Sequence, residues 1–266
     1  MEHESAFLRQ AHLNNWHKYL QSLGSPAESG WDVCVLTASD EAQAAIYRRQ
    51  LDWRREAGLL PRGTYFTVVP DPGGRRIGSG GATLRVLRDL AAGELGDAAS
   101  RALIIHSGGD SRRLPHCSAL GKLFARVPRA LPDGRASTIF DEFLIGLSGL
   151  AGELPAGALI ASGDVLIIFD HLQLSFQRRG VIGVAAAAPA ALALRHGVYV
   201  SEPGSHRVRA YLHKPPAGEI ERWGALQPDG SVQIDTGLVW LDTATVGSMS
   251  ELTEQAAVAA TWAGRG

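Results

Sequence analysis

Cysteine is scarce in this chain of 266 residues, which contains only Cys34 and Cys117. Cys34 lies in a β-branched apolar segment that predicts a buried strand, and Cys117 lies in a predicted loop. Two such cysteines do not indicate a disulfide framework, and the nine histidines show no Cys/His spacing typical of a zinc site. We therefore expect reduced thiols and a cytoplasmic protein.

The chain also lacks a long apolar run, a secretory signal and an excess of charge. Its longest apolar stretch, Val181 to Leu194, is shorter than the roughly 20 residues that a membrane span needs, and we interpret it as core. The amino terminus has no basic region followed by an apolar stretch. A net charge of -1 gives no general attraction for polyanions, so we expect neither a nucleic acid nor a membrane as partner.

The remaining pattern is that of a globular α/β protein. A helix is expected at 4–23, followed by a connector that ends at residue 30. From Trp31 onward, apolar runs alternate with amphipathic stretches, which favours a doubly wound, mostly parallel sheet. Strands are expected at 31–37, 65–69, 102–106, 159–161, 165–169 and 181–187, and helices at 41–57, 82–90 and 137–150.

The pattern changes after Gly197 to short strand-like pieces between Pro/Gly turns, which predicts antiparallel strands added beside the parallel sheet. The last stretch, 243–263, is expected to be helical and has no clear closing element, so we interpret the chain as a candidate fragment of a longer protein. The expected organisation is an amino-terminal helix and connector at 1–30 and one large domain at 31–266.

The strongest functional signal follows the apolar strand Ala102 to His106, where the sequence continues Ser-Gly-Gly-Asp-Ser-Arg-Arg-Leu-Pro. The carboxyl end of a parallel strand is where an α/β sheet places its ligand crevice. Gly108 and Gly109 let backbone N–H groups approach phosphate oxygens because no Cβ intervenes. They are candidate nucleotide-binding residues.

Cations cluster around this glycine pair. Arg112 and Arg113 supply guanidinium groups suited to phosphate, and Lys122 adds a mobile point charge. The alternative is an ordinary glycine turn with solvated arginines, which this clustering disfavours. The segment is not a Walker A loop, because Leu123 stands where that motif has Ser or Thr.

Two further segments carry candidate residues. Gly78-Ser-Gly80-Gly81-Ala-Thr83 precedes a predicted helix, and it either binds an anion at the helix N-terminus or is a flexible turn. Thr83 replaces the third glycine of the dinucleotide fingerprint, so hydride transfer is not expected. Asp164, in Ser-Gly-Asp after a predicted strand, is either part of a common turn or a hard oxygen ligand for a cation beside a triphosphate.

The segment from Ser107 to Pro115, with Lys122, resembles the G-G-x-x-x-R-L-P…K motif of nucleotidyltransferases. It is most similar to the fucose-1-phosphate guanylyltransferase (GDP-fucose pyrophosphorylase) and L-fucokinase family, whose GSGGATL loop is also similar to the segment at 78–84. The resemblance implies a Rossmann-like nucleotidyltransferase domain at 31–266. It places Arg113, Lys122 and Asp164 in catalysis, with Asp164 holding Mg²⁺, and Gly80, Gly81, Thr83, Gly108, Gly109 and Arg112 on the nucleotide.

Two looser matches imply sugar-phosphate contacts. Lys214 stands in a His-Lys-Pro segment that resembles a family E-K-P segment, with His213 in place of the acidic residue. Asp235 stands where an N-x-G segment has Asn. A lysine before proline is as often a solvated strand end, so that alternative stays open.

The resemblance implies transfer of a guanylyl group from GTP to L-fucose 1-phosphate, with Mg²⁺, giving GDP-fucose and pyrophosphate. Sugar kinase activity is not expected, because the Gly/Ser-rich ATP loop of such a kinase is missing. One alternative is a catalytically weak nucleotide-binding module of a truncated bifunctional fucokinase/guanylyltransferase. Another is nucleotidyl transfer to a different sugar 1-phosphate.

Overall fold

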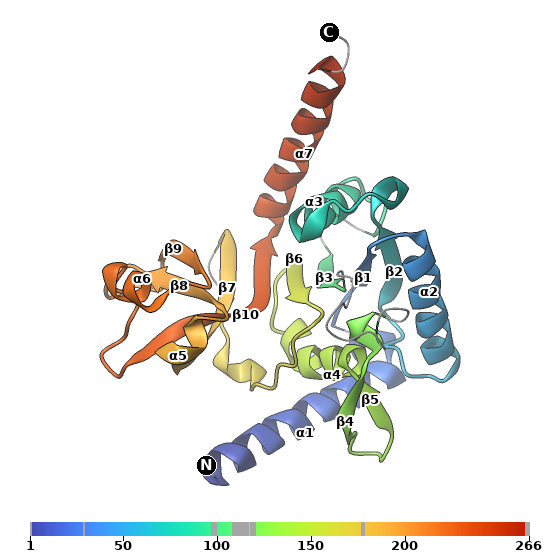
Figure 1. The fold of residues 1–266 in the computed structure, drawn as a ribbon. Helices are drawn as coiled ribbons and strands as arrows, with labels where there is room; N and C mark the ends of the chain where they lie inside the picture. Colours follow the sequence, from blue (N-terminus) through green and yellow to red (C-terminus); the bar gives the residue numbers. More distant parts are fainter. Residues whose placement is uncertain are drawn as a thin grey trace. The chain divides into compact units, whose positions relative to one another are not determined.

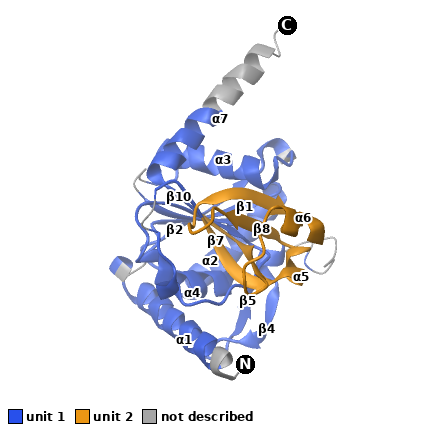
Figure 2. Cartoon of the chain, turned by 90° about the vertical axis from the view of Figure 1, so that its left-hand side faces the viewer, with its two compact units in different colours: residues 1–182, 240–266 blue, residues 183–239 orange. Residues whose placement is uncertain are grey.

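The computed structural model describes residues 2–28, 30–96, 100–107, 117, 121–176 and 179–263. Figure 2 shows two compact units, of which unit 1 comprises Met1–Ile182 with Trp240–Gly266 and unit 2 comprises Gly183–Val239. The expected boundary at residue 30 stays a prediction. None of the described helices is long and apolar enough to cross a membrane.

Unit 1 is built on parallel strands, as the alternating pattern predicts. The strands run in the order β2-β1-β3-β6, and each neighbouring pair is parallel. All six residues of β1 are buried, as expected for a strand covered on both faces. The bounds are β1 Val33–Ala38, β2 Tyr65–Pro70, β3 Arg101–His106 and β6 Gly157–Ser162.

Helices cover both sides of these strands, which confirms the doubly wound α/β prediction. Figure 1 shows α3 and α7 on one side and α1 and α4 on the other. The α4 helix is apolar almost all round because α1 covers the face that the sheet leaves open. The helix bounds in unit 1 are α1 Glu2–Gly24, α2 Glu41–Glu56, α3 Gly78–Ala91, α4 Ile139–Ala151 and α7 Thr243–Ala263.

Local capping explains where two of these helices begin. Asp40 caps α2, since its Oδ1 accepts a hydrogen bond of 2.8 Å from the Gln43 N–H. Thr138 and Asp141 form a reciprocal capping box at the start of α4.

An antiparallel hairpin between η4 Lys122–Phe124 and α4 was not expected. It consists of β4 Arg126–Ala130 and β5 Ala136–Thr138. The remaining 3₁₀ turns are η1 Pro26–Glu28, η2 Pro72–Gly74 and η5 His171–Gln173.

Unit 2 contains the antiparallel strands expected after Gly197. β8 pairs antiparallel with both β10 and β9, and β7 also pairs with β10. Residues 231–242 form one continuous strand, β10, rather than short separate pieces, and its last residues belong to unit 1. The bounds are β7 Val181–Pro189, α5 Ala190–Ala193, β8 Gly197–Ser201, β9 Val208–His213, α6 Ala217–Arg222 and β10 Ser231–Asp242.

One expectation about apolar segments is wrong and another holds only in part. The run 165–169 is irregular rather than a strand, and it lines a small cavity against α4 instead of joining the sheet. The stretch Val181 to Leu194 is core only in part, because Val184, Ala188 and Ala193 are buried whereas Val181 is 60% exposed. Both free cysteines are buried, as expected of Cys34 in its strand.

Candidate functional site

The candidate site lies at the carboxyl ends of the parallel strands in unit 1. Thr37 on β1 lies opposite His106 on β3, which lies opposite Ser162 on β6, so that the three strands end level. Loops that leave this edge of a parallel sheet form the ligand crevice. The predicted residues Gly108, Gly109, Arg112 and Arg113 follow β3 in the sequence and lie outside the described residues.

Lys122 and Asp164, predicted separately, meet at this edge. The Lys122 Nζ lies 3.4 Å from Asp164 Oδ2, although 42 positions separate the two residues in the sequence. Their side chains are 31% and 57% exposed. An ion pair with this exposure contributes about 0.2–1 kcal/mol, so a ligand can separate the two groups at little cost.

Two glycines set the position of this pair. Gly163 donates a 2.6 Å hydrogen bond to the His106 carbonyl oxygen at the end of β3, and a Cβ on Gly163 would lie 2.5 Å from that oxygen. Gly121 has a φ of +69°, and a Cβ there would overlap the hydroxyl group of Tyr47 on α2. Each glycine therefore allows a close approach that no other residue permits, one residue before Asp164 or Lys122.

A second part of the site is the N-terminus of α3, where the predicted residues Gly80, Gly81 and Thr83 lie. Ile77 occupies the N-cap position and no side chain caps the helix. Unsatisfied N–H groups and the helix dipole favour an anion at such an end. The space beside Gly80 is open, since a Cβ there would meet nothing within 4 Å.

A cavity of about 320 Å³ adjoins this helix end. Its walls come from the ends of β1 and β3, the segment after β2 and the first turn of α3. The residues that line it include Ser39, Asp71, Arg76, Ser79 and His106. A volume of this size lies within the range of small-molecule sites.

His106 joins the strand ends to α3. Its Nδ1 lies 3.0 Å from Thr37 Oγ1, and its Nε2 lies 2.7 Å from Thr83 Oγ1. The Thr83 hydroxyl also lies 2.9 Å from the Ser79 carbonyl oxygen, which can only accept, so the hydroxyl donates there. Nε2–H then donates to Thr83, and Nδ1 accepts from Thr37. Burial lowers the pKa of His106 to about 4, which keeps the ring neutral near pH 7.

The hydrogen bonds of His106 to Thr37 and Thr83 were not predicted from the sequence. The position of His106 at the end of a buried strand indicates that it lies at the carboxyl edge of the sheet. Its hydrogen-bond partners, Thr37 and Thr83, lie on other elements and could not be identified from that position. Thr83 is held by His106 and Ser79, and its predicted contact with a nucleotide stays a prediction.

The other two predicted residues, Lys214 and Asp235, lie in unit 2. Asp235 Oδ2 accepts a 2.9 Å hydrogen bond from Tyr211, and Oδ1 accepts bonds of 3.2 Å from Tyr199 and 2.8 Å from the Gly237 N–H. Lys214 has a φ of +49°, the one positive φ recorded for a residue other than glycine in the described part of the chain. Such a backbone costs of order 1–3 kcal/mol, and strained residues of this kind cluster at functional sites.

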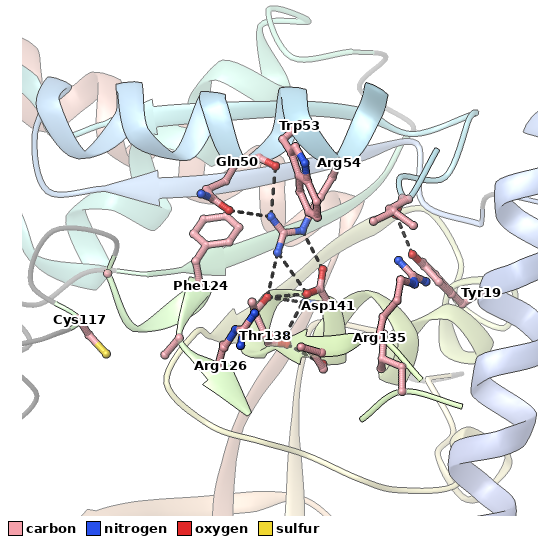
Figure 3. A pocket seen from close by; sticks show the side chains of 16 residues that line it. Tyr19, Gln50, Trp53, Arg54, Cys117, Phe124, Arg126, Arg135, Thr138 and Asp141 are labelled. Atoms are coloured by element: carbon pink, nitrogen blue, oxygen red, sulfur yellow. Dashed lines mark hydrogen bonds and ion pairs between the residues drawn. The ribbon is translucent and has the colours of Figure 1, made fainter. Parts of the chain in front are cut away.

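A larger cavity of about 740 Å³, shown in Figure 3, was not predicted at all. It is lined by residues of α1, α2, the β4–β5 hairpin and the start of α4. At its wall, the buried Arg54 guanidinium bonds both carboxylate oxygens of Asp141, at 2.8 and 3.1 Å. The same group lies 5.0 Å from the centre of the Phe124 ring. The sequence alone does not distinguish the buried Arg54 from the exposed arginines beside it on α2, which is why its ion pair was not predicted.

Asp164 places an exposed carboxylate, a hard oxygen ligand of the kind that Mg²⁺ takes, beside Lys122 at the carboxyl edge. Among the described residues there is no cluster of three or more His, Cys, Asp or Glu side chains suited to a metal. A dedicated cage is not required, since Mg²⁺ in phosphate-transfer sites is held by one or two carboxylates together with substrate phosphates and water. The exposed carboxylate of Asp164 fits this pattern.

Parallel strands covered by helices define a doubly wound α/β protein. The lysine–carboxylate pair and the uncapped helix end make the carboxyl edge its candidate ligand site. A family model, the fucose pyrophosphorylase domain, matches residues 98–261, which is more than half of the chain. The chain belongs to this fucose pyrophosphorylase family.

Individual relatives agree with this family. The chain is 32% identical over 240 residues to fucose-1-phosphate guanylyltransferase of Mus musculus and 31% identical over 244 residues to that of Homo sapiens. These matches cover 83% and 84% of the chain but 40% and 39% of the relatives. A bifunctional fucokinase/GDP-fucose pyrophosphorylase of Arabidopsis thaliana is 29% identical over 88% of the chain and 26% of the relative. The chain therefore spans less than half the length of each.

Proposed function

We propose that this chain is a sugar-1-phosphate nucleotidyltransferase domain that transfers the guanylyl group of GTP to L-fucose 1-phosphate and releases pyrophosphate. The observation that carries the proposal is the Lys122–Asp164 pair, 3.4 Å apart at the carboxyl edge of the sheet in a chain of the fucose pyrophosphorylase family. The names of the mouse and human relatives support the choice of guanine and fucose.

The reaction needs positioning and charge stabilisation more than a protein nucleophile. A phosphate oxygen of the sugar phosphate attacks the α-phosphorus of GTP, and the bond between the α-phosphorus and the bridging oxygen breaks as pyrophosphate leaves in line. Lys122 stabilises the negative charge that develops on the phosphates. Arg113, Gly108 and Gly109 are expected to assist it.

Asp164 is the proposed ligand of Mg²⁺. When bound, the ion would neutralise charge on the phosphate oxygens. In the ligand-free protein, Lys122 partly neutralises Asp164, and this exposed pair is weak enough to separate when a triphosphate enters. One pair of side chains thus provides a cation for phosphate and a carboxylate for the metal.

The cavity beside α3 is the proposed site of the nucleoside. The uncapped helix end with Gly80 and Gly81 favours the phosphate side of the ligand. Asp71 lines the cavity, and a carboxylate can accept hydrogen bonds from both N1–H and N2–H of guanine. Adenine presents no such pair of donors on its corresponding edge. Asp71 thereby favours GTP over ATP.

A second candidate function is a nucleotide-binding module without turnover of its own. It is favoured by the length of the relatives, of which this chain covers 40% or less. Binding of GTP without pyrophosphate release would distinguish this candidate from the enzyme.

The test is a substrate panel with pyrophosphate detection. The chain is incubated with Mg²⁺, one of GTP, ATP or UTP, and one of several sugar 1-phosphates that include L-fucose 1-phosphate. We expect the fastest release with GTP and L-fucose 1-phosphate, and GDP-fucose as the second product. Release that is fastest with another pair would replace the proposed substrates, and GTP binding without release from any pair would favour the module.

A further inference from the structure

Tyr47, a residue of α2, packs against the turn that carries Lys122. Its side chain is fully buried, and its ring meets that of Phe124 edge-on, with the ring centres 5.2 Å apart. Its hydroxyl group reaches Gly121, where a Cβ would overlap it. One side chain thus contacts both ends of the segment 121–124, and Lys122 lies between the two contacts.

The Tyr47 hydroxyl group is buried without a hydrogen bond. No group in the described part of the chain meets hydrogen-bond geometry with it. Burial raises the pKa of Tyr47, so the phenol keeps its proton near neutral pH. A buried donor without an acceptor destabilises a protein, and native structures contain few of them. Phenylalanine would keep the ring contacts without that cost, so the hydroxyl group itself needs an explanation.

Ser107 is the neighbouring group that can accept this bond. Its side chain is buried directly after β3, and its nearness to Tyr47 partly offsets the effect of burial on the Tyr47 pKa. The Ser107 hydroxyl donates its own proton to the Thr37 carbonyl oxygen, so its oxygen keeps lone pairs that can accept. A bond from Tyr47 to Ser107 would join the segment that leads into Gly108 to the segment that carries Lys122.

We propose that Tyr47 is a positioning residue for nucleotide binding, whose hydroxyl group donates to Ser107 Oγ once a triphosphate occupies the carboxyl edge. A triphosphate draws Lys122 away from Asp164, and the turn that Tyr47 contacts moves with it. The bound state then gains a hydrogen bond that the free state lacks, which strengthens binding. This inference rests on the proposed function and deepens it by naming a buried residue that acts through the Lys122 turn.

The test compares Tyr47→Phe with the wild type by urea unfolding without ligand and by isothermal titration of the full chain with GTP and Mg²⁺. We expect the urea midpoint of the ligand-free variant to rise, because the substitution removes an unpartnered buried donor. We expect GTP binding to weaken about 3- to 10-fold, the loss of one hydrogen bond that only the bound state makes. A merely structural residue would not change stability and affinity in these opposite directions.

Tyr19→Phe is the matched control. Tyr19 is also a buried tyrosine of unit 1, 4% exposed, but its hydroxyl group donates a 2.8 Å hydrogen bond to the Leu59 carbonyl oxygen. The substitution breaks a bond that the free protein makes, so it should lower the urea midpoint and leave GTP affinity unchanged. The two variants lose the same atom and are expected to differ in both measurements.

Ser107→Ala tests the partner of the phenol in a double-mutant cycle. In the Ser107→Ala background, Tyr47→Phe should change GTP affinity by less than about 2-fold, because the acceptor is already missing. A loss of the same size in both backgrounds would show that the hydroxyl group has another partner and would overturn the proposed bond to Ser107.

Two results would overturn the positioning role of Tyr47. They are equal GTP affinity in Tyr47→Phe and the wild type, and a lower urea midpoint for Tyr47→Phe than for the wild type. Pyrophosphate release by the wild type is measured in parallel, so that the two proposals fail separately. Release with equal GTP affinity in the two proteins removes the inference and keeps the proposed function. Weaker GTP binding by Tyr47→Phe without any release by the wild type keeps the positioning role and removes the enzyme.

Discussion

Replacing Arg54 with Met tests whether the buried ion pair at the larger cavity holds unit 1 together. The Arg54 side chain is 3% exposed, and besides Asp141 its guanidinium bonds Thr138 Oγ1 at 3.1 Å and Gln50 Oε1 at 2.9 Å. Methionine keeps most of the apolar stem but leaves the Asp141 carboxylate without its cation. Breaking a buried pair by removing one partner costs about 3–5 kcal/mol, a large part of the 5–15 kcal/mol that stabilises a typical domain.

The assay is equilibrium unfolding in urea at pH 7. Arg48→Met is the matched control on the same helix, because the Arg48 and Glu41 side chains of that ion pair are 44% and 70% exposed. We expect the control to lose less than about 1 kcal/mol. Free energies of unfolding that agree within about 0.5 kcal/mol between the two variants would refute the reasoning.

Three further predictions concern the carboxyl edge of unit 1. Burial holds the folded pKa of His106 at about 4, below its ordinary 6.5, so the unfolded chain binds more protons between these pH values. The free energy of unfolding should therefore fall by up to about 3 kcal/mol as the pH drops through this window, and His106→Asn should remove that part of the pH dependence in urea titrations. Gly163→Ala should lower pyrophosphate release at least about tenfold, because the added Cβ displaces the backbone before Asp164. Asp71→Asn should raise the KM for GTP about tenfold and leave that for ATP unchanged, in steady-state assays.

Each of these three predictions has an outcome that would contradict it. Parallel pH profiles for the wild type and His106→Asn would contradict the first. Full pyrophosphate release by Gly163→Ala would contradict the second. For Asp71→Asn, an equal rise in KM for both nucleotides would indicate a structural effect and contradict base recognition.

Much of the fold could be predicted because local pattern and tertiary structure agree. Strands such as Val33–Ala38 are continuous β-branched runs that both faces of the sheet bury, and Asp40 is a capping residue whose effect is local. The run 165–169 shows where this reasoning fails. Most of its residues line a small cavity with α4 rather than pairing with a neighbouring strand, and composition alone does not distinguish the two.

The proximity of Lys122 and Asp164 could be expected for the same reason, while their roles in a site stay a prediction. Lys122 and Asp164 each follow a glycine, and Asp164 also follows a strand end, so the topology of a parallel sheet brings the two together. The bonds of His106 to Thr37 and Thr83 depend on three elements far apart in the sequence. The spacing of residues along the sequence does not predict such hydrogen-bonded pairs. The close approach of Gly121 to Tyr47 likewise has a meaning only once α2 lies against the turn before Lys122.

The most direct test of the central claim is pyrophosphate release from GTP and L-fucose 1-phosphate by the wild type, Lys122→Ala and Lys18→Ala. Lys18 is an exposed lysine of α1 and serves as the control. We predict that the wild type and Lys18→Ala release pyrophosphate at equal rates and that Lys122→Ala is slower by a factor of about 100 or more, with unchanged thermal stability. Equal rates for all three proteins would contradict the claim that the Lys122–Asp164 pair forms the centre of a nucleotidyltransferase site.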